Sequence, residues 1–150
     1  QGLANAGYRA IDSCRIEKGY LYWSGDISPD YNPYEAGLGF CVDMDKGDFI
    51  GRDALAKIKT EGIARKLCSF TIDGFAPVPG GEAIMLDGKV LGSTTSVSFG
   101  HTLQKTIAFG YLPSEVAHEK AFSIEAFGKG HRAARGARCL YDVKMERLKA

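Results

Sequence analysis

The sequence lacks an excess of charge of either sign. Its 19 Lys and Arg residues are balanced by 18 Asp and Glu residues, which leaves a formal net charge of +1 in 150 residues. A chain with this balance creates no overall field that would attract nucleic acid or an anionic membrane surface. We therefore expect neither a nucleic acid nor a membrane partner, and we expect any ligand to be recognised by a local arrangement of side chains.

Closely spaced cysteines and long apolar runs are also lacking, and we expect no signal peptide. The four cysteines, Cys14, Cys41, Cys68 and Cys139, form no Cys-x-x-Cys pair and no zinc-ligand spacing with histidine. We expect free buried thiols, no metal, and a reducing compartment, either the cytoplasm or the mitochondrial matrix of a eukaryote. The first residue is Gln rather than Met, so we expect this chain to be part of a longer protein.

The first 62 residues contain two helical patterns and one apolar run. Apolar residues recur with a helical period from Ala6, and we expect this helix to end near Lys18 or Gly19. The run Leu38–Val42 predicts a short buried strand. A second amphipathic helix is expected over Asp53–Thr60, where it would connect two structural units.

Beyond residue 62 the sequence changes to short segments rich in Val, Ile, Thr and Phe, separated by glycine turns. Asp87-Gly88 gives the clearest turn signal, because both residues tolerate the positive φ that a two-residue hairpin requires. About six strands suggest a small barrel or sandwich, in an α+β fold that is mainly β. The expected strands are Lys66–Ile72, Glu82–Leu86, Lys89–Ser98, Thr106–Leu112, Ala121–Phe127 and Arg132–Tyr141.

Arg15, Glu17 and Trp23 are the candidate ligand-binding residues near the end of the first helix. A carboxylate can accept two hydrogen bonds from an amidine-like edge such as that of a pterin, an aromatic face can stack on a heterocycle, and Arg can pair with carboxylates. The same three residues also fit a surface ion pair beside a core tryptophan. Spacing alone leaves both interpretations open.

Three blocks of sequence carry a resemblance to a known family. They are Asp12–Tyr20 with Trp23 and Asp26, then Asn32–Leu38, then Lys46–Arg52. Together they resemble the C-terminal half of the glycine cleavage T-protein (aminomethyltransferase) family, and Gly92–Ser96 and Lys105–Tyr111 resemble its C-terminal β-barrel. Arg-Ile-Glu-Lys-Gly-Tyr at 15–20, followed by Trp23, is most similar to the folate-dependent tail of dimethylglycine and sarcosine dehydrogenases.

The resemblance implies a fold and an activity. Residues 1–62 would be the C-terminal segment of a folate-binding domain, a short α/β remnant with a connector helix, and residues 63–150 an antiparallel barrel of about six strands. The expected function is part of a tetrahydrofolate-dependent aminomethyltransferase unit in a dimethylglycine or sarcosine dehydrogenase-like demethylase. Such a unit captures a one-carbon group from an amine or iminium as 5,10-methylenetetrahydrofolate.

The resemblance also implies site residues and partners. Glu17 matches the family's folate-contacting glutamate, and Arg15 matches the residue two positions before that glutamate. Lys46 falls where the family has a basic contact residue, and Trp23 occupies an aromatic position near the pocket. The family's catalytic aspartate lies in an upstream part, so we expect no catalytic residue in this chain and weak or absent activity of the chain alone. The parent enzyme would bind FAD elsewhere, act on a methylated amine, and supply upstream catalytic domains as partners.

Two other functions remain as alternatives to the dehydrogenase-like parent: a fragment of a free glycine cleavage T-protein, and a noncatalytic folate-binding or docking module. The basic run Lys129–Arg138 could also contact a folate polyglutamate tail or RNA phosphates. Arginines three residues apart lie on opposite faces of a strand, which favours a solvated barrel rim instead.

Overall fold

The computed structural model describes Gly2, residues 4–147 and Lys149. Three short helical elements precede six strands along the chain. The helical elements are α1 (Tyr8–Lys18), the 3₁₀ helix η1 (Gly39–Cys41) and α2 (Arg52–Glu61). The strands are β1 (Arg65–Asp73), β2 (Ala83–Leu86), β3 (Lys89–Gly100), β4 (Lys105–Pro113), β5 (Ala121–Ala126) and β6 (Lys129–Gly136).

Helix α1 ends where the sequence predicts. Gly19 adopts a left-handed conformation with φ of 80°, and the amides of Gly19 and Tyr20 donate to the carbonyls of Ile16 and Arg15. This is the hydrogen-bond pattern of a glycine-terminated helix. A Cβ at Gly19 would also lie 2.7 Å from the Arg138 carbonyl oxygen, so glycine is required here for two reasons.

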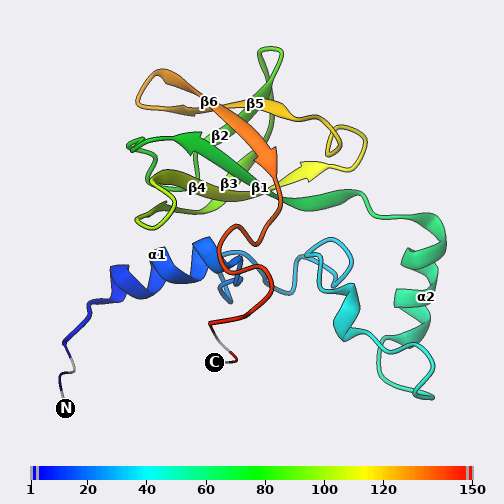
Figure 1. Cartoon of the computed structure of the whole chain (residues 1–150). Coiled ribbons are helices and arrows are strands. Elements are labelled where there is room, and N and C mark those ends of the chain that lie inside the picture. Colours follow the sequence, from blue (N-terminus) through cyan, green and yellow to red (C-terminus); the bar gives the residue numbers. More distant parts are fainter. Residues whose placement is uncertain (1, 3, 148, 150) are drawn as a thin grey trace.

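The six strands form a closed antiparallel barrel in the order β1-β4-β3-β2-β5-β6, with β6 paired back to β1. The expected mainly β fold with about six strands is confirmed. Asp87 and Gly88 both have positive φ, at 49° and 77°, and join β2 to β3 by the predicted tight turn. Figure 1 shows the barrel packed beside α1, with α2 standing away from it at the far side of the molecule.

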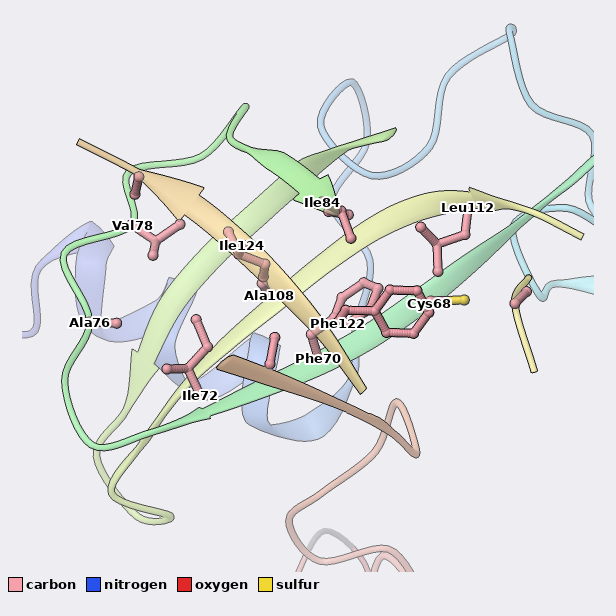
Figure 2. Packing of buried hydrophobic residues seen from close by; sticks show 13 residues of the cluster. Cys68, Phe70, Ile72, Ala76, Val78, Ile84, Ala108, Leu112, Phe122 and Ile124 are labelled. Carbon is pink, nitrogen blue, oxygen red and sulfur yellow. The ribbon is translucent and has the colours of Figure 1, made fainter. Parts of the chain in front are cut away.

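Apolar side chains fill the barrel interior (Figure 2). Phe70 and Phe122 meet edge to face with ring centroids 5.4 Å apart, and Ile84 and Ile124 are fully buried beside them. A second apolar cluster of Ile16, Ile107 and Phe109 lies between α1 and the outer face of the barrel. Strand β4 is therefore buried on both faces, because its inner residues meet the core and its outer residues meet α1.

The structure corrects three of the predictions. Leu38–Val42 is not a buried strand: η1 occupies this segment, and Phe40 is 79% exposed. The amides of Leu38 and Cys41 donate to carbonyls three to five residues earlier, so the backbone forms local turns and leaves no row of groups for a partner strand. Cys14 and Cys41 are free but exposed rather than buried.

The last strand also ends earlier than expected, at Gly136 rather than Tyr141. Residues 137–141 leave the barrel because the amides of Leu140 and Tyr141 donate to the Glu17 carbonyl, at 3.0 and 3.1 Å. The C-terminal tail thus packs against the end of α1, as Figure 1 shows. The division into units 1–62 and 63–150 stays a prediction.

Replacing Phe70 with Ala should lower the free energy of unfolding by about 3 to 5 kcal/mol, because it leaves a cavity in the barrel core. Phe127→Ala is the matched control, since Phe127 is 77% exposed and should change stability by less than about 0.5 kcal/mol. Urea unfolding monitored by circular dichroism measures both. Equal losses in the two variants would contradict the assignment of the core.

Candidate functional site

Arg15 lies at the centre of a polar network between α1 and the barrel. Its guanidinium is 2.6 Å from Asp12 Oδ1, and Nη1 donates to Asp26 Oδ2 at 2.7 Å. Nη2 donates to the Ser96 hydroxyl on β3 at 2.9 Å, and Nη1 also reaches the Tyr20 carbonyl at 3.3 Å. The donors of this guanidinium therefore already have partners within the protein.

Asp26 is fully buried, and the same network neutralises it. Its Oδ2 accepts hydrogen bonds from Arg15 and from the Tyr22 amide, while Oδ1 accepts the Thr95 hydroxyl at 2.6 Å. The Asp26 carbonyl accepts the Tyr111 hydroxyl at 2.9 Å. A buried carboxylate needs this number of donors, because an unpaired charge in the interior is strongly destabilising.

Tyr111 extends the network to a layer of stacked side chains. Its ring stacks on Tyr31 with centroids 3.7 Å apart, and the Arg65 guanidinium lies 5.0 Å above the Tyr31 ring. Burial, reinforced by the neighbouring Tyr31 and Asp26, raises the pKa of Tyr111 well above its ordinary value. Arg65 is also 3.6 Å from the buried Glu35 carboxylate.

Reciprocal capping hydrogen bonds fix the backbone of the block Asn32–Leu38. Asn32 Oδ1 accepts the amides of Tyr34 and Glu35 at 3.0 Å each, and Glu35 Oε2 accepts the Asn32 amide at 3.2 Å. This reciprocal pair is a capping box. The Glu35 carbonyl then accepts the Leu67 amide at 2.9 Å, which attaches the turn to β1.

Glu17 is buried on a different side of α1 from Arg15. Two residues along a helix are about 200° apart, and Glu17 Oε1 accepts the amides of Thr102 and Leu103 in the turn between β3 and β4, at 2.7 and 3.2 Å. A Cβ at Gly100 would come within 2.8 Å of the same oxygen. Within the described part of the chain, no hydrogen bond reaches the second oxygen, Oε2.

Trp23 and Lys46 are both exposed. The Trp23 side chain is 65% accessible, and its backbone forms an isolated bridge with Ile27. The Lys46 ammonium lies 4.7 Å from the centroid of the Phe49 ring, in the segment beside α2 that Figure 1 places far from α1. The structure thus brings Arg15 close to the loop that carries Trp23, whereas Glu17 and Lys46 have other surroundings.

Sequence reasoning assigned no role to Asp26, Thr95, Ser96 or Tyr111. Asp26 belongs to the first of the family-like blocks, and Ser93–Ser98 is rich in Ser and Thr, but nothing in the sequence joins the two. The available signal was an aspartate that follows an aromatic turn and a strand rich in Ser and Thr. Asp26 and Thr95 are 69 residues apart in the sequence, and only the folded chain brings them together.

A hollow of about 940 Å³ lies between the first half of α1 and the segment 75–79. Phe99 forms part of its wall and makes edge contacts with Phe75 and His101, at centroid distances of 5.8 and 5.1 Å. None of the four predicted ligand residues lines this hollow. Among the described residues, no group of three or more His, Cys, Asp or Glu side chains is placed to hold a metal ion.

Comparison with known proteins agrees with both the barrel and the α1 segment. Residues 65–142 match the glycine cleavage T-protein C-terminal barrel domain, and residues 1–46 match the GCVT N-terminal domain. The chain belongs to the glycine cleavage T-protein family. The T-protein fold is also seen in the crystal structure of aminomethyltransferase T of the Bartonella henselae glycine cleavage system. That structure matches with a TM-score of 0.79 and 27% identity, over 85% of this chain and 37% of the other.

The relatives that this chain matches include enzymes of several kinds. Mouse mitochondrial sarcosine dehydrogenase is 40% identical over 99% of this chain and 17% of its own length. Mouse mitochondrial dimethylglycine dehydrogenase is 40% identical over 89% of the chain and 16% of its own length. An aminomethyltransferase of Symbiobacterium thermophilum is 44% identical over 79% of this chain and 31% of its own length. The chain therefore spans about a sixth of the dehydrogenases and a third of the transferase.

Neither α1 nor α2, in the part of the chain that the structure describes, has the length and apolar character needed to cross a bilayer.

Replacing Arg15 with Met should lower the free energy of unfolding by about 3 to 5 kcal/mol, because it leaves the Asp26 carboxylate buried without its cation. Lys57→Met is the control: its pair with Glu61 is exposed, at 3.9 Å, and its removal should cost less than about 0.5 kcal/mol. Chemical unfolding measures both variants. A loss for Arg15→Met no larger than that of the control would contradict a buried ion pair.

Tyr111 should make the protein less stable in alkali. Its pKa is raised in the folded state, so its contribution to stability is complete below the unfolded pKa of about 10 and is lost as the pH rises above that value. The slope of unfolding free energy against pH above 10 should therefore be smaller in Tyr111→Phe than in the unmodified protein. Tyr20→Phe, which removes a half-exposed hydroxyl, is the control. A slope unchanged by Tyr111→Phe would contradict the prediction.

Proposed function

We propose that this chain is the C-terminal part of a tetrahydrofolate-dependent aminomethyltransferase unit in a dimethylglycine or sarcosine dehydrogenase-like demethylase. The main support is the match to sarcosine dehydrogenase, which extends over 99% of the chain and includes both α1 and the barrel. The unit takes up a one-carbon group from an amine or iminium as 5,10-methylenetetrahydrofolate. Tetrahydrofolate supplies the two nitrogens that receive the carbon.

Glu17 is the residue of this chain best suited to hold the pterin. Its carboxylate is 3% exposed, and the amides of Thr102 and Leu103 fix Oε1. Oε2 is then oriented without a hydrogen bond from the described residues and can accept an N–H group of the pterin edge. A charged acceptor in a nearly dry position favours such a donor strongly.

Trp23, Lys46 and Arg15 have different parts in the proposal. Trp23 presents an exposed ring that can stack on a flat heterocycle, and the Lys46 ammonium can pair with the carboxylates of a folate tail once the rest of the folate-binding domain surrounds it. Arg15 has no donor left for a ligand, because Asp12, Asp26 and Ser96 already use its guanidinium. We assign it to holding the site together.

The parent protein supplies what this chain does not contain. We place the catalytic carboxylate and the methylated amine site in its upstream domains, and FAD in a separate domain. The described strands pair antiparallel around a barrel and form no crossover of the kind that binds dinucleotides, so the residues here do not fit FAD. The first relatives are mitochondrial enzymes, which supports the mitochondrial matrix as the location in a eukaryote.

A free aminomethyltransferase is the second candidate, and one observation favours it. The Symbiobacterium thermophilum aminomethyltransferase has the higher identity, 44%, although over only 79% of the chain. The gene sequence that encodes the residues before Gln1 distinguishes the two. A Gly-x-Gly-x-x-Gly flavin fingerprint there supports the dehydrogenase-like parent, and a short folate domain alone supports the free transferase.

Glu17→Gln should weaken tetrahydrofolate binding by about 1 to 3 kcal/mol, or roughly five- to 150-fold in Kd, because a neutral amide replaces the charged acceptor. Gln retains an oxygen for the Thr102 and Leu103 amides, so the fold should persist. Calorimetric titration of the longest natural chain that contains this sequence measures the Kd.

Glu119→Gln is the matched control, since it changes an exposed carboxylate whose ion-pair partner among the described residues is His118, at 3.3 Å. Its Kd should equal that of the unmodified protein. Equal affinities of Glu17→Gln and the control would refute the role of Glu17, and no measurable tetrahydrofolate binding by the unmodified protein would refute the function.

A further inference from the structure

The exposed Trp23 ring is not fixed in place by packing. Its side chain is 65% accessible. An aromatic ring that leaves most of its surface in water gains little orientation from packing. The backbone on either side of Trp23 fixes the direction of its Cα–Cβ bond and thereby limits where the ring can point.

The segment Tyr22–Ile27 closes on itself around Trp23. The Asp26 amide donates to the Tyr22 carbonyl at 2.8 Å, and the Ser24 amide donates to the Ile27 carbonyl at 2.8 Å. Ser24 adopts a left-handed conformation with φ of 69°, which turns the chain directly after Trp23. We call this segment the Trp23 loop.

Asp26 attaches the Trp23 loop to the rest of the protein. Its Oδ2 binds the Tyr22 amide at 2.9 Å, immediately before Trp23, and Arg15 of α1 at 2.7 Å. Its Oδ1 binds the Thr95 hydroxyl of β3 at 2.6 Å. One buried carboxylate thus joins the loop to both the helix and the barrel.

We propose that Asp26, held by Arg15 and Thr95, is a positioning residue that orients Trp23 to stack on a flat ring of tetrahydrofolate. This inference rests on the proposed function. Asp26 is fully buried, and its carboxylate oxygens already accept hydrogen bonds from Arg15, Tyr22 and Thr95, so it acts through Trp23. A ring fixed before binding loses less conformational freedom when the ligand arrives, and the difference appears as affinity.

A double-mutant cycle tests whether Asp26 acts through Trp23. Asp26→Asn keeps the size of the side chain but removes the charge and places an amide donor against Arg15 or Thr95. In the longest natural chain containing this sequence, it should raise the Kd for tetrahydrofolate about tenfold or more. In the Trp23→Ala background the same change should raise the Kd by less than about twofold, because the ring that Asp26 orients is gone.

Thr95→Val serves as a milder second variant if Asp26→Asn does not fold. It removes one hydrogen bond at nearly constant volume and should raise the Kd about three- to tenfold, again only when Trp23 is present. Asp30→Asn, which changes an exposed carboxylate next to the Trp23 loop, is the control and should leave the Kd unchanged.

Fluorescence of the 150-residue chain provides a readout that does not depend on ligand. Trp23 is the single tryptophan in this sequence, so time-resolved anisotropy reports its motion directly. Asp26→Asn or Thr95→Val should increase the amplitude of nanosecond motion at temperatures where circular dichroism shows the barrel folded. The control Asp30→Asn should not.

The outcomes separate this inference from the proposed function. An equal loss of affinity with and without Trp23, or unchanged Trp23 motion in the folded variants, overturns the positioning role. A loss of binding in Glu17→Gln but not in Trp23→Ala overturns it as well and leaves the folate function standing. No tetrahydrofolate binding by the unmodified protein overturns the folate function and with it the purpose assigned to Asp26.

Discussion

The buried carboxylate of Asp26 is the interaction on which the arrangement of the N-terminal segment depends. A charge removed from water must be compensated by nearby donors, and three separate parts of the chain supply them: Arg15 from α1, the Tyr22 amide from the loop, and the Thr95 hydroxyl from β3. Any displacement of the helix from the barrel would leave this carboxylate unpaired. The helix, the loop and the sheet are therefore held in one geometry, from which Trp23 projects.

Polar contacts determine the position of α1 as much as apolar packing does. Only Ser13, Ile16 and Glu17 of its described residues are buried, so the apolar contact is narrow. The Ser13 hydroxyl donates to the Phe99 carbonyl at 2.7 Å, and Glu17 accepts two amides from the turn after β3. Directional bonds of this kind specify one register of the helix along the strands, which an apolar contact alone would leave loosely defined. The candidate pterin contact is thus also a structural residue, with one carboxylate oxygen used for each purpose in our proposal.

The barrel could be predicted from the sequence because its signals are local. Alternating apolar residues and the Asp87-Gly88 turn report on neighbours a few residues away, and these predictions are confirmed. The strand predicted at Leu38–Val42 was wrong because an apolar run does not show whether a partner strand exists. The turn capped by Asn32 and Glu35 leaves this segment without a partner strand among the described residues. The arrangement of the candidate site was harder to predict from the sequence than either of these elements. Arg15 and Glu17 were grouped by spacing, yet they lie on different sides of α1, and their partners come from 81 and 85 residues away. Family resemblance identified the residues, whereas the structure assigns their neighbours.

A crystal structure of the longest natural chain that contains this sequence, bound to a reduced folate, is the most direct test of the proposed folate site. We expect an N–H group of the pteridine to lie within hydrogen-bond distance of Glu17 Oε2 and the Trp23 ring to stack on the ligand. We also expect Asp26 to keep Arg15 and Thr95 as its partners. A folate bound away from both Glu17 and Trp23 would contradict the proposed site.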